Sequence, residues 1–325
     1  MARRISYAKA LNEAMAEELE RDERVFVMGE DVGAFGGVFG VTAGLQERFG
    51  DKRVFDTPVS EAWIVGGGVG AALTGMRPVV ELQFADFIYN AADEITGKMA
   101  KWRYMHGARF TVPMVVRLPE GAIGGAGPEH SQCPEAMLLQ HPGTYITIPA
   151  TPYDAKGLLK SAIRDDNPVC FFENKALYND MGEVPEEEYT IPLGQADLKR
   201  QGGDVSIIAW GRMVGRALEA AEQVARDGVD VEVLDLRGLR PLDVEAIIAT
   251  VEKTGRVIIS HEAPKTGGGG GEIAAIIAEQ ALTALDAPIR RVCGVDVPIP
   301  QSLKLEQYAI PSTDDLVLAI KEVTA

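Results

Sequence analysis

Two residues of this sequence have the type and the position needed to move protons. Glu61 lies in DTPVSEAWIVGGGVGAALTG (56–75), after a turn that follows a strand pattern ending near Phe55. His130 lies in the glycine-rich loop GAIGGAGPEHSQC, which follows the apolar run VPMVVRL. Carboxylates and imidazoles are common general acids and bases, and loops at strand ends often carry them. Each also has a structural interpretation: Glu61 as an acid that complements a helix dipole, and His130 as an ordinary surface histidine.

A second group of polar and aromatic residues has a more ordinary context. Phe87, in ELQFADFIYNAADEI, follows another strand pattern, where an aromatic side chain is by default part of the core. Asp93 and Glu94 begin the next helical pattern, so we interpret them as first-turn acids. The remaining histidines, which have no comparable context, are His106, His141 and His261.

The segment GGGVGA (66–71) matches the letters of the dinucleotide fingerprint, but its context differs. The fingerprint needs a glycine directly after a strand, whereas about ten residues of helical character intervene here. Thr57 and Pro58 resemble an N-cap and a first helical residue, which places the glycines inside a helix. An interior glycine costs a helix up to about 1 kcal/mol, so some other contact must compensate. Because Gly66 and Gly70 lie one turn apart, we expect another backbone to approach this face of the helix closely.

A second glycine-rich segment, HEAPKTGGGGGEIAA (261–275), lies where a strand pattern gives way to a helical one. Backbone N–H groups at such a junction can bind phosphate. The segment lacks both the P-loop lysine and the GxGxxG spacing, so a flexible turn or a subunit contact is the favoured interpretation.

These residues must be positioned by a mostly parallel sheet, because short apolar runs alternate with helical patterns along the chain. The runs RVFVMGE, RPVVELQF, VPMVVRL, YITIPA and NPVCFFE predict strands, and LNEAMAEELER, EITGKMAKWRYM and YDAKGLLKSAIRD predict helices. The acidic, weakly periodic stretch from about 180 to 203 predicts a linker. A second α/β series follows it, from VSIIAWG to IRRVCGV, so the fold class is α/β in two domains.

Composition narrows the class of protein. A chain of 325 residues that is 46% hydrophobic can bury a large core, and its net charge of −16 argues against nucleic-acid or anionic membrane partners. Three widely spaced cysteines support neither a disulfide framework nor a zinc site and suggest a reducing compartment. The first 24 residues fit neither a secretory signal nor a transit peptide, and no apolar run approaches the length of a membrane span.

Several motifs, in order along the whole chain, together resemble the beta chain of the decarboxylating component of 2-oxo acid dehydrogenase complexes. They are GEDVGAFGGVFGVTAGL, DTPVSE, ELQFADF, HSQCPEA, TPYDAKGLLKSAIRDDNPVCFFE and HEAPKTGGGGGEIAA. The resemblance implies a pyrimidine-binding thiamine diphosphate domain (1–182), a linker (183–203) and a transketolase-like C-terminal domain (204–325). It also implies oxidative decarboxylation of a 2-oxo acid, pyruvate or branched-chain, with transfer of the acyl group to a lipoyl domain.

The resemblance implies roles for individual residues. Glu61 would hydrogen-bond a ring nitrogen of the cofactor's aminopyrimidine and favour its imino form. Phe87 would pack on the pyrimidine ring, and His130, in the family's HSQ motif, would assist proton transfer during acyl transfer. Structural potassium would be bound at Met114 and in SAIRDDNP, by Ala162, Ile163, Asp165 and Asn167.

The same resemblance implies a partner chain. Thiamine enzymes hold magnesium and diphosphate through a GDG motif followed by NN, and this chain has neither. The family supplies that half from an alpha subunit in an alpha2beta2 heterotetramer, which also meets a dihydrolipoyl acyltransferase core. The expected compartment is the bacterial cytoplasm, or the mitochondrial matrix for a mature eukaryotic chain. One departure, Pro128 and Glu129 before HSQ, bears on how that loop is ordered.

Two alternatives remain open at the level of sequence. A self-sufficient NAD-binding oxidoreductase would use Gly66–Ala71, and Glu81 could serve as its acidic residue, but it needs a strand directly before the glycines. A non-catalytic assembly subunit would keep the fold and would not depend on Glu61.

Overall fold

The computed structural model describes residues 2–325, which divide into two compact units. Of the described residues, unit one comprises 2–120 and Met137–Leu193, and unit two comprises Gly121–Ala136 and Gly194–Ala325. The stretch 183–203, expected to be a linker, contains the end of one strand and the whole of another.

Unit one is built around a parallel sheet. The strands of both its sheets are β1 (Ala2–Ser6), β2 (Val25–Gly29), β3 (Val54–Asp56), β4 (Arg77–Glu81), β5 (Val115–Glu120), β6 (Tyr145–Thr147), β7 (Val169–Asn174) and β8 (Met181–Pro185). The parallel strands follow the order β6-β7-β5-β4-β2-β3, while β1 and β8 form a separate antiparallel pair. Strands β2, β5 and β7 are buried along their whole length, as expected for a sheet covered on both faces.

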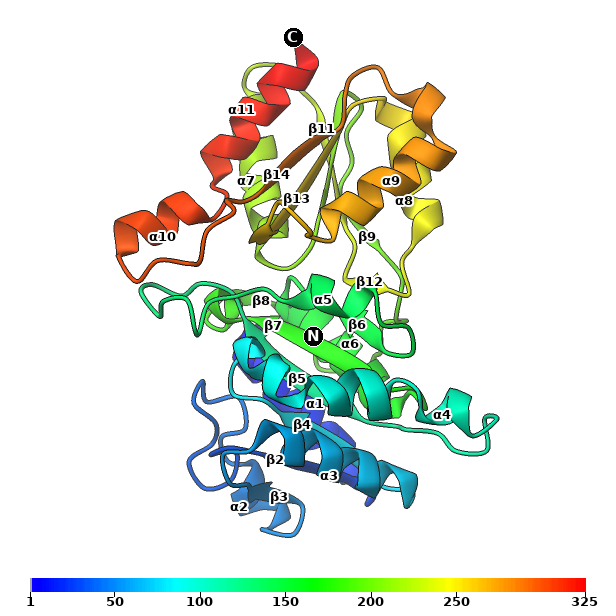
Figure 1. Cartoon of the computed structure of the whole chain (residues 1–325). Coiled ribbons are helices and arrows are strands. Elements are labelled where there is room, and N and C mark those ends of the chain that lie inside the picture. Colours follow the sequence, from blue (N-terminus) through cyan, green and yellow to red (C-terminus); the bar gives the residue numbers. More distant parts are fainter. Residues whose placement is uncertain (1) are drawn as a thin grey trace. The chain divides into compact units, whose positions relative to one another are not determined.

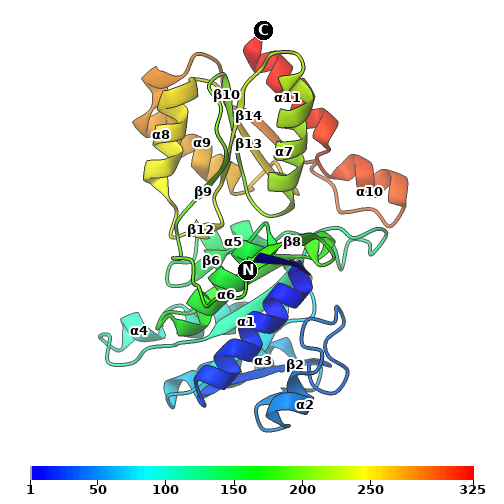
Figure 2. The same ribbon diagram turned by 180° about the vertical axis from the view of Figure 1, so that it is seen from behind.

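Helices cover both faces of this sheet. They are α1 (Tyr7–Arg21), α2 (Leu45–Phe49), α3 (Glu61–Leu73), η1 (Ala85–Ala91), η2 (Glu94–Met99), α4 (Trp102–Met105), α6 (Pro152–Arg164) and η3 (Lys175–Leu177). Figure 1 shows α3 along one face, and the reverse view in Figure 2 shows α1 and α6 packed together along the other. Side chains cap the long helices: Ser6 accepts the Lys9 amide before α1, and Thr151 accepts that of Asp154 before α6.

Two predicted helices differ in detail from the observed ones. Helix α3 begins at Glu61 rather than near Thr57, because the Thr57 amide donates to the Gly29 carbonyl at 2.9 Å and holds that residue against β2. The predicted helix 94–105 is broken into η2, a π-helical turn, and α4. Thr96 Oγ1 donates to the carbonyl four residues earlier at 2.7 Å, a bond that commonly bends helices.

Unit two is a second α/β layer structure. Its elements are β9 (Asp197–Arg200), β10 (Val205–Ala209), α7 (Arg212–Ala225), β11 (Val231–Asp235), β12 (Gly238–Arg240), α8 (Val244–Thr254), β13 (Val257–Pro264), α9 (Gly270–Gln280), η4 (Leu282–Ala284), β14 (Arg290–Gly294), α10 (Leu303–Ala309) and α11 (Thr313–Thr324). The sheet order is β14-β13-β10-β11-β9, with only β9 antiparallel. Helices α7 and α11 lie on one face and α8 and α9 on the other (Figures 1 and 2).

A buried ionic network joins three strands of the first sheet. The Arg117 guanidinium, fully buried in β5, donates to both carboxylate oxygens of Glu173 at 2.7 Å and also contacts Glu81. Tyr178 Oη donates to Glu173 at 2.9 Å. Glu81, which a dinucleotide site would need as its free acidic residue, is therefore committed to an ion pair. Among the described residues, no helix combines the length and apolar character needed to cross a membrane.

Candidate active site

The carboxyl edge of the unit-one sheet brings acidic residues together. Strand β2 ends at Gly29 and is followed by Glu30, while helix α3 starts at Glu61 shortly after the end of neighbouring β3. Open parallel sheets place their ligand chemistry at this edge. Glu61, which the sequence singled out, therefore lies at the end of the sheet where a ligand is expected.

Glu61 is the first residue of α3, and its side chain is 7% exposed. The Asn90 side-chain amide donates to Glu61 Oε2 at 3.3 Å. A carboxylate in a helical first turn is stabilised by the helix dipole. A purely dipole-complementing acid does not need burial, however, and burial costs a carboxylate part of its hydration. The position of Glu61 thus favours a role beyond helix capping.

Glu30 is the acidic neighbour that sequence reasoning missed. It is 6% exposed, and burial, followed by the charge of Glu61, raises the pKa of the Glu30 carboxyl above its ordinary value. A nearby negative charge makes a carboxyl group harder to ionise, so Glu30 keeps its proton to a higher pH than an exposed glutamate does. The signal was present in the sequence as an acid directly after a strand, in the motif GEDVG.

Phe87 lies on η1, the short helix that packs against α3 and also carries Asn90. Its half-buried ring meets Phe84 edge-on, with 5.6 Å between ring centroids. Phe84 in turn packs edge-on against Phe39 at 5.6 Å. Phe87 therefore belongs to a group of aromatic rings that includes Phe84 and Phe39, and it lies on the element that contacts Glu61.

His130 belongs to unit two, in the loop that follows β5. The imidazole is half-buried, and its backbone amide donates to the Gly127 carbonyl at 3.4 Å. Pro128 and Glu129, the two departures from the family's pattern, are both exposed. Gln132 Nε2 donates to the Pro128 carbonyl at 2.9 Å, which closes the loop around the histidine.

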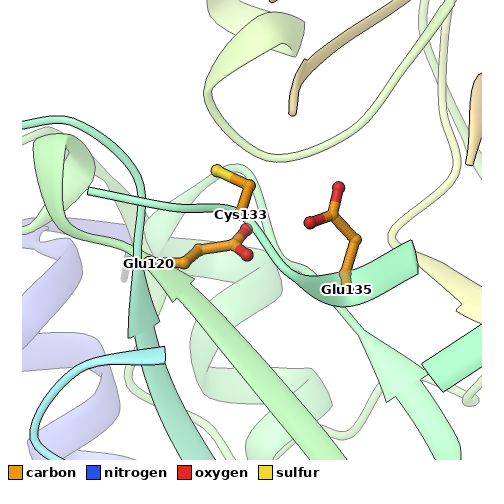
Figure 3. A group of neighbouring side chains, drawn as sticks. All are labelled: Glu120, Cys133 and Glu135. Atoms are coloured by element: carbon orange, nitrogen blue, oxygen red, sulfur yellow. The ribbon is translucent and has the colours of Figure 1, made fainter. Parts of the chain in front are cut away.

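The segment after His130 leads into the short helix α5 (Glu135–Leu139). Its first residue, Glu135, is a buried acid. Figure 3 shows Cys133 and Glu135 on this segment of unit two, and Glu120, the last residue of β5, in unit one; all three are buried. Burial raises the pKa of Glu135 to about 7. The Trp210 indole N–H donates to Glu135 Oε1 at 3.3 Å, which partly offsets that effect of burial.

Trp210 also stacks on His261, with ring centroids 4.9 Å apart and 19° between the planes. His261 is fully buried, and burial lowers the pKa of its imidazole to about 4. Two glycines of HEAPKTGGGGGEIAA pack against this ring: a Cβ on Gly268 would lie 2.4 Å from His261 Cε1, and one on Gly270 would lie 2.9 Å from His261 Nε2. Gly268 and Gly270 therefore leave room for the histidine, which accounts for these two glycines without a phosphate ligand.

The glycines of GGGVGA lie inside α3, as predicted. The closest approach is made by Gly68, where a Cβ would lie 2.8 Å from Met114 Cε and 3.0 Å from Val80 Cγ1. Gly66 meets only the Glu94 side chain at ordinary distances, and Gly70 meets nothing within 4 Å. A dinucleotide loop needs its glycines directly after a strand, so this placement removes the structural basis for the NAD-binding alternative.

The residues expected to bind potassium surround the end of α6, where an arginine is already present. Arg77 Nη1 donates to the backbone carbonyls of Ile163 at 3.1 Å and Asp165 at 2.9 Å. The Met114 carbonyl accepts the Val169 amide at 2.9 Å. These oxygens suit a hard cation in kind, but a guanidinium occupies part of their capacity.

Comparison with known proteins first identifies the class of protein to which this chain belongs. The "Transketolase, pyrimidine binding domain" model matches residues 3–181, and the "Transketolase, C-terminal domain" model matches residues 194–316. A solved structure described as "Split gene transketolase, inactive beta4 tetramer" has a TM-score of 0.81 and 21% identity, and covers 98% of both chains. The protein is thus of the two-domain transketolase type, which confirms the α/β fold class.

Relatives with higher identity narrow this class. The 2-oxoisovalerate dehydrogenase subunit beta of Bacillus subtilis is 49% identical over 98% of both chains. The pyruvate dehydrogenase E1 component subunit beta of the same organism is 48% identical over 97% of both. Its acetoin:2,6-dichlorophenolindophenol oxidoreductase subunit beta is 46% identical, over 99% of this chain and 98% of the relative. The chain belongs to the family of beta subunits of 2-oxo acid dehydrogenases, as its motifs predicted.

Proposed function

We propose that Glu61 is the residue through which this beta subunit activates thiamine diphosphate. When bound, the cofactor supplies the nucleophilic ring carbon and accepts the electrons left by departing carbon dioxide. The observation that carries the proposal is a buried carboxylate at the carboxyl edge of the sheet, held by Asn90 beside Glu30. Such a carboxylate can share a proton with a ring nitrogen, and Asn90 fixes its orientation.

The other two predicted site residues receive complementary roles. Phe87, on the element that also carries Asn90, would support the flat face of the pyrimidine. His130, on a loop closed by its own hydrogen bonds, would hold or release a proton as the acyl group passes to a lipoyl domain. The substrate would be a 2-oxo acid, pyruvate or branched-chain, because relatives acting on both are equally similar.

The proposed assembly is an alpha2beta2 heterotetramer that serves an acyltransferase core. Magnesium and the cofactor's diphosphate would be held by the alpha subunit, because this chain has neither GDG nor NN. The bacterial cytoplasm is the proposed compartment, consistent with cysteines that form no disulfide with one another: Cys133, Cys170 and Cys293. Potassium would bind at the end of α6 and share the carbonyls of Ile163 and Asp165 with Arg77, since each carbonyl has two lone pairs.

Glu61→Gln tests the proposed activation. Glutamine keeps the volume and can hydrogen-bond, but it cannot share an acidic proton. We expect exchange of the proton on the cofactor's acidic ring carbon to slow by about 10²- to 10⁴-fold, the usual range for general acid–base assistance. The measurement is hydrogen–deuterium exchange in the enzyme reconstituted with its alpha subunit.

Glu47→Gln is the matched control, because Glu47 is an exposed first-turn acid of another helix, α2, in the same unit. Both variants lose a similar dipole interaction, about 0.3–1 kcal/mol. If the two variants exchange the proton equally fast, Glu61 is a helix-capping charge and the assembly-subunit alternative gains support.

A further inference from the structure

The loop that carries His130 is closed near the histidine by its own hydrogen bonds, whereas the glycines before it adopt backbone conformations that other residues rarely take. Its glycines Gly124, Gly125 and Gly127 all have positive φ values, of 97°, 88° and 78°. Such residues give a chain freedom that is lost only when other groups fix the backbone. The amides of Ala122, Gly124 and Gly125 have their acceptors outside the loop, on other described residues of unit two.

A carboxylate from α10 meets two consecutive amides of this loop. The Gly124 amide donates to Glu306 Oε1 at 2.8 Å, and the Gly125 amide donates to Glu306 Oε2 at 2.6 Å. Glu306 is 5% exposed although its neighbours Leu305 and Gln307 face solvent. Successive N–H groups around positive-φ glycines form an anion-binding concavity, and here the anion is a side chain of the same unit.

Further contacts fix the beginning of the loop. The Ala122 amide donates to Glu262 Oε1 at 2.8 Å, and the Ala122 carbonyl accepts from Arg212 Nη1 at 3.2 Å. Ala122 also packs in a small apolar cluster with Ile299, Ala309 and Ile310, at the two ends of the segment that carries Glu306. The loop is thus bound to the C-terminal part of the chain at its start and at its glycines.

We propose that Glu306 is a positioning residue that holds the His130 loop in the shape required for acyl transfer. The inference rests on the role proposed above for His130. Hydrogen bonds to a charged acceptor are roughly twice as strong as neutral ones, so one carboxylate can order two glycines. Without it, two amides would lose their buried acceptor and the loop would adopt other conformations.

The experiment compares Glu306→Ala, Glu306→Gln and Glu306→Asp in the enzyme reconstituted with its alpha subunit. Glu279→Gln is the matched control, because Glu279 is an exposed acid on α9 of the same unit. Three quantities are measured: amide hydrogen exchange at Gly124 and Gly125, decarboxylation with an artificial electron acceptor, and acyl transfer to a lipoyl domain.

We expect Glu306→Ala to speed amide exchange at both glycines and to slow acyl transfer, each by about 10- to 100-fold, with a smaller loss of decarboxylation. Glu306→Gln should show nearly the same loss of slow exchange and of acyl transfer as Glu306→Ala, because the glutamine NH₂ group would face one of the two donating amides. Glu306→Asp should recover part of both properties, because it keeps the charge. Added formate should also partly restore acyl transfer in Glu306→Ala.

Two results would overturn the proposal. One is unchanged exchange and unchanged acyl transfer in Glu306→Ala. The other is an equal loss of both activities together with faster exchange throughout unit two, which indicates general destabilisation. The proposed role of His130 is tested separately by His130→Ala: if that variant transfers acyl groups normally, the histidine assignment fails, while the exchange measurement still decides whether Glu306 orders the loop.

Discussion

At the residue scale, Glu135 and His261 are both uncharged near pH 6 for the same physical reason. Burial raises the pKa of Glu135 from 4.5 to about 7 and lowers that of His261 from 6.5 to about 4. Between about pH 4.5 and 7 the folded protein keeps a proton on Glu135 that the unfolded chain releases, so the free energy of unfolding falls as pH rises. His261 has the opposite effect: folding excludes a proton below its unfolded pKa, so stability rises with pH between about 4 and 6.5.

Single substitutions should separate these opposing effects. Relative to the natural chain, Glu135→Gln should gain stability as pH rises from 5 to 8, and His261→Asn should gain stability as pH falls from 7 to 4. Each relative change should stay below about 3–4 kcal/mol, because one pKa unit corresponds to about 1.4 kcal/mol. Urea unfolding at a series of pH values measures the free energy of unfolding of each protein. Parallel curves for all three proteins would show that neither group is held neutral by burial.

The residues of the candidate site differed in how far they could be predicted. The position of Glu61 at a strand-to-helix junction marked it as a candidate, but its proposed catalytic role came only from the resemblance, as did the proposed role of Phe87. Glu30 had a local signal, an acid after a strand. Glu306 had none, because its partner Gly124 lies 182 residues away and sequence patterns report only neighbours.

At the scale of elements, α3 has one glycine that faces the sheet and one that faces open space. Gly68→Val should destabilise the chain by about 1–3 kcal/mol, because Val80 cannot move away from the added methyl groups. Gly70→Ala should stabilise the isolated chain by about 0.5–1 kcal/mol, since alanine favours helices and nothing lies nearby. Thermal unfolding measures both effects. Impaired assembly of Gly70→Ala with an alpha subunit would identify the close subunit contact that the sequence predicted for this face.

The stability of the C-terminal end of α6 should depend on which cation binds its backbone carbonyls. Arg77→Met removes the donor to the carbonyls of Ile163 and Asp165 and takes one positive charge from the negative end of the helix dipole. We expect potassium to raise the unfolding temperature of this variant more than that of the natural chain, and sodium to raise it less. Unfolding curves in chloride salts at equal ionic strength test this expectation. Equal responses of both proteins to the two salts would mean that no potassium site exists here.

Element types were predicted better than their boundaries. The strands from β2 to β7 and the helix α6 fall where apolar patterning placed them. The start of α3 was misplaced because Thr57 and Pro58 look like a helix start, while Thr57 is held against β2 by a bond to Gly29. Such a tertiary bond outweighs local preference and leaves no mark in a short stretch of sequence.

At the scale of the whole molecule, the chain should be an incomplete enzyme. Without an alpha subunit we expect no magnesium-dependent binding of thiamine diphosphate at micromolar concentrations, because the chain lacks both GDG and NN. Titration calorimetry on the isolated chain measures this, with the reconstituted enzyme as positive control. Tight binding by the isolated chain would contradict the proposed division of the site.

The two-unit organisation was only partly visible in the sequence. Alternating apolar runs and helical patterns indicated two α/β series, which the family comparisons confirm. The grouping of Gly121–Ala136 with unit two was not predictable, because that segment lies between two elements of unit one in the sequence. Its place depends on the contacts of Ala122 and Glu306, which only the folded chain brings together.

The stack of Trp210 on His261 gives the protein an internal optical reporter. A protonated imidazole accepts an electron from an excited indole far more readily than a neutral one, so tryptophan emission should dim as His261 gains its proton. The chain has only three tryptophans, and replacing Trp63 and Trp102 with phenylalanine would leave Trp210 as the sole emitter. Light from one side chain would then follow the acid–base state of the interior of unit two, in real time and without an added label.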